Sequence, residues 1–457
     1  MKNKLYTYIV TLLLICGVCT ACSEDVFEEI DIMDTPVLLK GTFPTKDVII
    51  EIGDSYVFEP QLKDSTDAQY SWNVNGQEVS TSATYTFKTT RPCQAEVSCT
   101  ITNNMGKIVL STMVSTNHDF TKGFYVVLPL EIGFYDTGKG AYYDSCYQSL
   151  NKGEKFGSDI YVMPYQSKLY ITRNTNVSNT NHLFVVDGRT LQKKYATSIG
   201  ANQLYTFMLD DRYMLITGGD VYRYDTKTQQ AVKIYDYIYP FIFRAGLLNN
   251  KLLLSRSYNS QDDKLYYYEL ETVLNSGIEE LPEAEVMSSI IQNNKSNFIQ
   301  ASDGSCYTLY SSSDNNEYKL IRILSDLTTE EVNLSFATPT TNWYNIYFPG
   351  ITGVSSASNS FVLIPSKDNA IYKYTVGDES SLSTPFIAAP DDGKNLCGSG
   401  VLVDSEAQQI YALYQKPSGE GKGGYIVVYD YNGVQTKSIS LGESIPQHLV
   451  FNSELSN

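Results

Sequence analysis

The chain has 457 residues, with 34 Lys and Arg against 51 Asp and Glu and a formal net charge of -17 at pH 7. This length allows two domains with a sizeable core. The acidic balance argues against nucleic acid and anionic membrane surfaces as partners. The chain holds 37 Tyr beside only 3 His and 2 Trp, which suits pleated strands with solvated faces better than a catalytic centre.

Residues 1–21 predict an export signal. Two lysines precede an apolar run that is too short to span a bilayer. The run ends in CTAC at residues 19–22, which resembles the bacterial lipobox, with Cys19 in place of the usual Leu. The resemblance implies that Cys22 is acylated and becomes the mature N-terminus, where three acyl chains would hold the protein on a membrane. The alternative is an ordinary signal peptide with a chance cysteine.

The next segment, residues 22–35, contains the acidic stretch SEDVFEEIDIMDT and has no turn or core pattern, so it predicts a tether. Acids placed directly after the acylated cysteine resemble the sorting signal that sends lipoproteins of the Bacteroidetes to the outer face of the outer membrane. This resemblance implies a cell-surface location.

Residues 36–118 show alternating strands with frequent turns, which predicts a small β-sandwich. We expect Trp72 and Tyr70 to face its core, and Asn75-Gly76 to form a hairpin turn. The run YSWNVNGQEV, followed by TYTF and EVSCTITNNMGKI, resembles PKD and immunoglobulin-like domains.

Residues 119–457 repeat one pattern, in which two or three apolar residues are followed by an acid and a turn. HLFVVDGRT at residue 182 is the clearest copy, and VYRYDTKT, LYYYELET, IRILSDLT, IYKYTVGD, YIVVYDYNG and the weaker AYYDS are the others. Seven copies of a four-stranded unit predict an all-β fold, a β-propeller. A central strand of each unit is anchored at Tyr125, Tyr170, Tyr213, Leu253, Tyr307, Phe361 and Tyr411.

The two ends of this region predict how the ring closes. The tail SIPQHLVFN looks like an opening strand with nothing after it, and residues 124–150 look like later strands with nothing before them. We therefore expect the two ends to pair in one composite blade, which leaves no free sheet edge. Seven blades are predicted, and six or eight remain alternatives.

A PKD-like module, a KGFYVVL strand at residue 122 and then a repeat domain resemble the PKD-like family lipoproteins of the Bacteroidetes. The resemblance covers most of the mature chain and implies association with SusC/SusD-type outer-membrane import systems. The propeller also resembles YncE-like surface propellers, some of which capture corrinoids for a TonB-dependent transporter. The shared motifs are structural, so they transfer no catalytic residue.

Two sets of residues are candidate ligand contacts, because propellers bind ligands on the face formed by the loops between blades and between the second and third strands. Aromatic residues in two inter-blade loops would stack on sugar rings or flat cofactors; they are Tyr237, Tyr239, Trp343, Tyr344 and Tyr347. Basic residues at equivalent strand ends would form a ring that receives carboxylate or phosphate; they are Arg173, Arg256, Lys367 and Lys416, which Arg244 would join. The alternatives are packing between blades for the aromatic residues and solvated strand ends for the basic ones.

Enzyme and metal motifs are not evident. GxSxG, HExxH and P-loop patterns are absent, and the three histidines are scattered. Asp187, Asp225 and Asp430 recur where strands meet turns, so we expect them to cap those turns. Residues 261–263 and 391–393 hold paired acids that lack calcium-loop spacing. Cys93, Cys99, Cys146, Cys306 and Cys397 are expected to be small buried residues, with no zinc pattern and no disulfide framework.

These observations favour a non-enzymatic surface lipoprotein without a cofactor or metal. It would bind a nutrient, a glycan or glycopeptide, for an outer-membrane TonB-dependent transporter and its SusD-like lipoprotein, and would touch the membrane only through its acyl anchor. The alternatives are a corrinoid-capturing propeller, a module that clamps the transporter, and a propeller glycosidase or lyase with two acids at the channel mouth.

Overall fold

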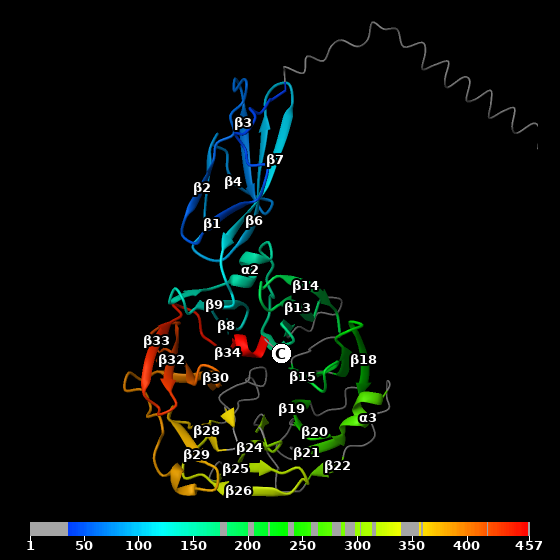
Figure 1. The fold of residues 1–457 in the computed structure, drawn as a ribbon, viewed down its shortest axis with the longest axis vertical. Coiled ribbons are helices and arrows are strands. Elements are labelled where there is room, and N and C mark those ends of the chain that lie inside the picture. The colour runs from blue at the N-terminus through cyan, green and yellow to red at the C-terminus, as the bar shows by residue number, and fades with distance from the viewer. Residues whose placement is uncertain are drawn as a thin grey trace, which may run out of the picture. The chain divides into compact units, whose positions relative to one another are not determined.

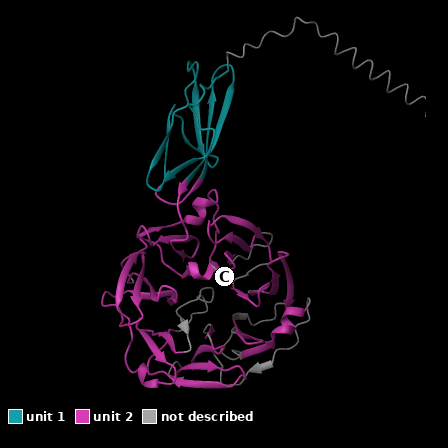
Figure 2. Ribbon diagram, viewed as in Figure 1, with its two compact units in different colours: residues 1–89, 95–115 teal, residues 90–94, 116–457 magenta. Residues whose placement is uncertain are grey.

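The computed structural model describes residues 35–455 except 174–180, 200–204, 218–219, 236–241, 257–263, 277–284, 288–297, 302, 313–316, 340–355, 358–359 and 418. Its regular structure is almost entirely β-strand (Figure 1). Contacts divide the chain into two compact units (Figure 2). Unit 1 comprises residues 1–89 and 95–115, and unit 2 comprises residues 90–94 and 116–457.

Unit 1 is a sandwich of two antiparallel sheets, ordered β1-β7-β6-β3-β4 and β2-β5. The strands are β1 (Val48–Glu51), β2 (Ser55–Phe58), β3 (Gln69–Val74), β4 (Gln77–Ser80), β5 (Tyr85–Lys88), β6 (Gln94–Thr102) and β7 (Lys107–Asn117).

Trp72 is the centre of the sandwich core, as predicted. It is fully buried, its Nε1 donates to the carbonyl of Ser82 at 2.8 Å, and its ring lies within 5.7 Å of Phe58 on β2 and Tyr85 on β5. The indole therefore joins the two sheets while its one polar group stays paired. Asn75 and Gly76 both have positive φ between β3 and β4, which confirms the predicted hairpin turn.

Unit 2 is a propeller, and its described residues form seven sheets arranged as a ring (Figure 1). Blade 1 is β34 (His448–Phe451), β8 (Gly123–Val127), β9 (Ile132–Asp136) and β10 (Ala141–Tyr143). Blade 2 is β11 (Ile160–Tyr165), β12 (Lys168–Arg173), β13 (Leu183–Asp187) and β14 (Lys193–Thr197). Blade 3 is β15 (Tyr205–Met208), β16 (Tyr213–Thr217), β17 (Val221–Asp225) and β18 (Gln230–Tyr235). Blade 4 is β19 (Ile242–Leu248), β20 (Lys251–Arg256), β21 (Lys264–Glu269) and β22 (Glu285–Met287).

Of the remaining blades, blades 5 and 7 also have four strands, and only blade 6 lacks a fourth strand among its described residues. Blade 5 is β23 (Ile299–Gln300), β24 (Cys306–Ser311), β25 (Tyr318–Ile323) and β26 (Thr329–Asn333). Blade 6 has three strands, β27 (Ser356–Ala357), β28 (Phe361–Pro365) and β29 (Ile371–Thr375), and a single bridge from Ile371 to Ile387 stands where a fourth strand would pair. Blade 7 is β30 (Asn395–Asp404), β31 (Gln409–Gln415), β32 (Gly424–Asp430) and β33 (Gln435–Ser440). The described residues of the unit also form the short helices α2 (Cys146–Leu150), α3 (Leu270–Asn275), η4 (Glu379–Leu382) and η5 (Asn452–Leu455).

The ring closes as the sequence predicted. The C-terminal strand β34 pairs antiparallel with β8, with Leu449 opposite Val126 and Val450 opposite Tyr125. The seven predicted anchor residues all lie in the second strand of their sheet.

Alternating side chains explain why the ring is stable. Along β12, Leu169 and Ile171 pack in the cluster shared with blade 1, whereas Tyr170 packs in the cluster shared with blade 3. Among the described residues, seven hydrophobic clusters occur in this way, one between each pair of neighbouring blades. Second and third strands such as β12 and β13 are buried on both faces and are close to continuous apolar runs, whereas outer strands such as β33 are largely exposed.

Candidate functional site

The candidate site lies on the face of unit 2 where the blades are connected to one another. Strands within each blade are antiparallel, as in the register of β11, β12, β13 and β14. The ends of second strands and the connections to the next blade therefore share one face. We call this face the inter-blade face.

The structure brings the predicted basic positions to this face. Arg173 and Arg256 are the last residues of β12 and β20, Lys416 directly follows β31, and Lys367 lies two residues after β28. The side chain of Lys367 is exposed, and its backbone N–H donates to the carbonyl of Ala337 at 2.8 Å. The side chains of Arg256 and Arg244 lie outside the described part.

Arg173 already has partners within the chain. Its Nη1 donates to the carbonyl of Phe156 at 2.6 Å and its Nε to the carbonyl of Asn181 at 2.5 Å, while the guanidinium lies 5.4 Å from the ring centre of Phe184. Burial lowers the pKa of Arg173. In this arrangement two of its five N–H donors tie two connecting segments to blade 2, so the guanidinium already has a structural role and is held in place.

The predicted aromatic contacts lie outside the described residues. Tyr237 and Tyr239 belong to the connection between β18 and β19, and Trp343, Tyr344 and Tyr347 to the connection between β26 and β27. They remain predictions.

A connected set of polar residues runs across the inter-blade face from blade 6 to blade 1. Asn369, in the connection after β28, donates from Nδ2 to Oδ1 of Asn395 at 3.2 Å and accepts the N–H of Leu396 at 3.0 Å. Asn369 has φ +67, a conformation that asparagine tolerates better than most residues. The blade 6 connection is thereby fixed to the start of β30, the innermost strand of blade 7.

A bulge in β30 continues this set. The register with β31 shifts between Leu396 and Val401, so the residues between them leave the ladder. Ser399, within the bulge, donates its N–H to the carbonyl of Gln447 at 2.6 Å and its hydroxyl to the same carbonyl at 3.0 Å. Gly398 has φ +56, and a Cβ there would lie 2.3 Å from the Gln447 carbonyl oxygen. Only glycine fits this close approach.

The bulge also reaches the first residue of β34. The hydroxyl of Ser399 lies 2.7 Å from Nδ1 of His448. We call Asn369, Asn395, Ser399, Gln447 and His448 the polar arc, which joins blades 6, 7 and 1 through these contacts. Lys367 lies two residues before its first member. Lys416 follows Gln415, which pairs with Asn395.

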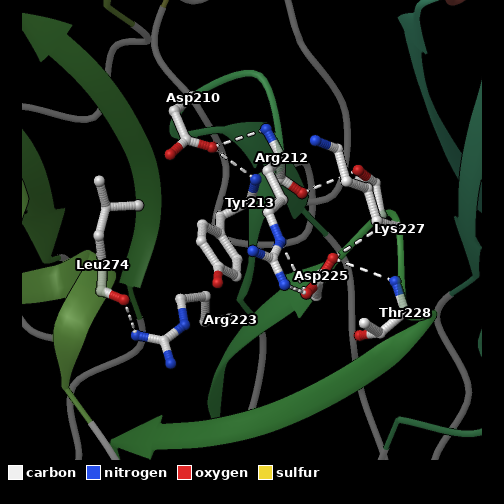
Figure 3. Close-up of polar contacts among 9 residues, drawn as sticks. Asp210, Arg212, Tyr213, Arg223, Asp225, Lys227, Thr228 and Leu274 are labelled. Atoms are coloured by element: carbon white, nitrogen blue, oxygen red, sulfur yellow. Dashed lines mark hydrogen bonds and ion pairs between the residues drawn. The ribbon is translucent and has the colours of Figure 1, made fainter.

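The corner aspartates are structural, as predicted. Asp225 Oδ1 accepts the N–H groups of Lys227 and Thr228, and its Oδ2 accepts Nε and Nη2 of Arg212 at 2.9 and 2.5 Å (Figure 3). The hydrogen bonds from Arg212 hold the pKa of Asp225 well below its usual range. Asp187 and Asp430 likewise accept two backbone N–H groups each in the turns that follow them.

Residues beside this turn of blade 3 also join blade 3 to blade 4. The ring of Tyr213 has the guanidinium of Arg212 at 4.9 Å and that of Arg223 at 5.1 Å (Figure 3). Arg223 donates to the carbonyls of Val273 and Leu274 in α3 of blade 4. The charge of Arg212 therefore stabilises the turn at Asp225, and that of Arg223 joins blade 3 to blade 4.

Metal and thiol chemistry finds no support among the described residues. His, Cys, Asp and Glu side chains nowhere gather there in the groups of three or more that hold a metal ion. Asp392 pairs with Lys394, and residues 261–263 lie outside the described part. The prediction for the cysteines is confirmed, because the five described ones are buried and free.

Sequence reasoning missed every member of the polar arc. One pattern would have pointed to it, since Cys397-Gly-Ser-Gly400 places two glycines inside a predicted strand, which marks a bulge or a close backbone approach. No pattern in the sequence links this bulge to Gln447 and His448, which lie nearly fifty residues further on.

The comparisons agree with this architecture. A PKD-like domain model matches residues 39–104. A crystal structure of a quinonprotein alcohol dehydrogenase-like protein from Bacteroides thetaiotaomicron is 32% identical, covers 92% of this chain and 99% of its own, and superposes with a TM-score of 0.81. BamB from Moraxella catarrhalis is 14% identical over 72% of this chain and 80% of its own, with a TM-score of 0.36.

No curated protein matches the chain. No helix in its described part combines the length and the apolar character needed to cross a membrane. The model of the domain of unknown function DUF5074 matches residues 121–452. The chain therefore belongs to the DUF5074 family and carries a PKD-like domain ahead of its propeller.

Proposed function

We propose that this protein is a non-enzymatic, lipid-anchored protein of the outer membrane that binds a nutrient ligand on the inter-blade face of its propeller. The ligand is a glycan or glycopeptide, and it is passed to a TonB-dependent transporter and its SusD-like lipoprotein. A PKD-like domain joined to a propeller, shared with a Bacteroides protein, fits a surface or periplasmic protein of the Bacteroidetes.

The polar arc is the observation that carries the proposal. Its amide, hydroxyl and imidazole groups come from three blades and are fixed by hydrogen bonds of 2.6 to 3.2 Å. Polar groups held in place before binding lose little entropy when a polar ligand arrives. Lys367 and Lys416 border the arc, and their charges would attract acidic groups on a glycan.

The lipid anchor supports the same role. The predicted acylation of Cys22 and the acidic tether after it would place the propeller at a membrane surface without a spanning segment. The PKD-like domain would then act as a spacer between the anchor and the propeller.

Thermal-shift measurements on the full chain test the proposal. The probes are neutral oligosaccharides, acidic oligosaccharides, a glycopeptide and cyanocobalamin. A ligand at about 100 times its Kd should stabilise the fold by roughly 2.7 kcal/mol, which a melting curve resolves easily. The probe should be recovered chemically unchanged. A cleaved or oxidised probe would favour an enzyme, and a response to cyanocobalamin alone would favour corrinoid capture.

A double variant locates the site. Lys367→Ala with Lys416→Ala should weaken an acidic oligosaccharide about tenfold, because two cations beside the arc are lost. Lys40→Ala with Lys88→Ala is the control, since it removes the same charge from exposed positions in unit 1. Equal binding by both double variants would place the site elsewhere, and no response to any probe would refute ligand capture.

A further inference from the structure

Two tyrosine rings from neighbouring blades meet where the central channel opens on the inter-blade face. Tyr161 is the second residue of β11 and Tyr205 is the first residue of β15, the innermost strands of blades 2 and 3 (Figure 1). Tyr161 pairs with Thr172 and Tyr205 with Thr217, at the ends of second strands that lie toward this face. Innermost strands line the central channel of a propeller, so both rings lie at its mouth.

The two rings belong to a longer aromatic row. The ring centres of Tyr161 and Tyr205 are 5.1 Å apart, with their planes at 50°. Phe207, two residues further along β15, has its ring centre 6.4 Å from that of Tyr205 and its plane 14° from parallel. The hydroxyl of Tyr205 donates to the carbonyl of Ala245 at 3.4 Å, which links the row to β19 of blade 4. All three rings are partly exposed. We call Tyr161, Tyr205 and Phe207 the channel aromatic row.

The two sides of β11 differ in burial. Ile160 and Val162 are buried and pack in the cluster shared with blade 1. The residues that alternate with them, Tyr161, Met163 and Tyr165, are all partly exposed. Contiguous apolar surface that is left open on a soluble protein marks a binding site more often than a packing surface.

A carboxylate stands beside the channel aromatic row. Asp159 directly precedes β11, two residues before Tyr161, the spacing that puts side chains on one side of an extended strand. Asp159 is partly buried, and burial raises its pKa. Among the described residues, none forms an ion pair or a hydrogen bond with its side chain. A carboxylate that has lost part of its hydration is stabilised by hydrogen-bond donors, so this one is open to the donors of a ligand.

We propose that Tyr161, Tyr205 and Asp159 form a stacking subsite for one pyranose ring at the mouth of the channel. A pyranose has an apolar face of C–H groups, which an aromatic ring covers, and hydroxyl groups at its edge, which donate to a carboxylate. The inference rests on the proposed function. It places one sugar of the glycan on blades 2 and 3, on the other side of the ring from Lys367 and Lys416.

Saturation-transfer difference NMR on the full chain tests the subsite. The probe is methyl β-D-glucopyranoside, in which H1, H3 and H5 project from one face of the ring and H2 and H4 from the other. Irradiation of the aromatic protons of the protein should saturate one of these sets more strongly, because a stacked sugar faces the tyrosines with one side only. Equal transfer to both sets, or no transfer with the probe at up to about 0.1 M, would overturn the subsite.

Substitutions of the tyrosines assign the transfer to these rings. Tyr161→Leu with Tyr205→Leu should weaken methyl glucoside about tenfold, because both aromatic faces are lost. Tyr161→Phe with Tyr205→Phe keeps the faces and should bind nearly as well as the wild type. Tyr431→Leu is the control, since Tyr431 is partly exposed in the turn after β32, on the opposite face of the propeller. Unchanged binding by the double Leu variant would place the sugar elsewhere.

Asp159→Ala supplies an arm that leaves the rings in place. It should weaken methyl glucoside about tenfold, because a charged acceptor for the hydroxyl groups is lost. It should not lower the melting temperature, because no internal partner of Asp159 is lost. Asp47→Ala, at an exposed position in unit 1, is the control. If the double Leu variant fails to fold, Asp159→Ala and the face-selective transfer of the wild type decide together.

The outcomes separate the subsite from the proposed function. Face-selective transfer that both the double Leu variant and Asp159→Ala weaken supports the subsite even if no oligosaccharide is captured. If the Lys367/Lys416 double variant weakens an oligosaccharide while the double Leu variant binds it normally, the subsite is overturned and the proposed function stands. Transfer to cyclohexylammonium without transfer to methyl glucoside would also overturn the subsite, since the carboxylate and the rings would then hold a cation.

Discussion

At the scale of single residues, burial changes the chemistry of one ordinary carboxylate. Glu131 lies between β8 and β9 and accepts the N–H of Ile132 at 2.9 Å and that of Gln148 in α2 at 3.3 Å. Burial nevertheless raises the pKa of Glu131 to about 7, and the nearby charge of Asp144 acts in the same direction. A carboxyl with a raised pKa binds its proton more tightly in the folded state.

This shift predicts a pH-dependent cost to stability. The folded-state pKa of Glu131 lies above its unfolded value, so its contribution is fully present below about pH 4.5 and is lost as the pH rises through about 7. Glu131→Gln removes this titration. Its unfolding free energy relative to the wild type should therefore improve by about 3 kcal/mol between pH 4.5 and 8.

Urea unfolding followed by circular dichroism at both pH values measures this difference. Glu406→Gln is the control, because Glu406 is exposed in the turn after β30. Parallel pH profiles for Glu131→Gln and the wild type would show that Glu131 titrates normally.

At the scale of elements, the bulge in β30 combines two constraints on one glycine. Gly398 and Gly377 both have positive φ, at +56 and +84. A Cβ at Gly377 would meet nothing within 4 Å, whereas a Cβ at Gly398 would collide with the backbone of Gln447. The pair therefore separates backbone strain from steric exclusion.

We expect Gly377→Ala to cost about 1 kcal/mol, from strain alone. Gly398→Ala should cost roughly 3 kcal/mol or more, because the bulge must also move away from β34. Thermal melting of the two variants measures the difference. Equal melting temperatures would mean that the contact between the bulge and Gln447 is loose.

The closing strand β34 makes a second prediction at this scale. Leu449 is fully buried in the cluster between blades 7 and 1. Leu449→Ala should destabilise the propeller by about 2–5 kcal/mol, whereas Val434→Ala, at a side chain that is 60% exposed, should change stability by less than about 0.5 kcal/mol. A shift in the urea midpoint for Leu449→Ala that is no larger than that for Val434→Ala would contradict the ring closure.

At the scale of the whole molecule, the proposed acyl anchor at Cys22 would decide where the protein works. Cys22→Ser should abolish acyl labelling and release the protein from the membrane fraction, because no other lipid attachment is predicted. Cys19→Ser should remain acylated, since Cys19 precedes the expected cleavage site. Acyl labelling of Cys22→Ser at the wild-type level would refute the lipobox.

The sequence by itself determined the all-β class and the way the ring closes. Alternating apolar residues and turn-capping acids act locally, so Trp72, the corner at Asp225 and the strand at His448 are readable without a structure. The sequence also indicated which strand ends lie on the inter-blade face, because successive strands of a blade are antiparallel and their ends alternate between the two faces. Ligand contacts at Trp343 and Tyr239 remain predictions of the sequence.

Only the tertiary structure decided what those residues touch. It showed that the guanidinium of Arg173 is occupied by two backbone carbonyls, and it brought Asn369, Ser399 and Gln447 into one connected set. Those contacts join residues that lie far apart in the chain, and they depend on the angle and spacing between blades. Local sequence patterns carry no record of that spacing, because many sequences close the same ring.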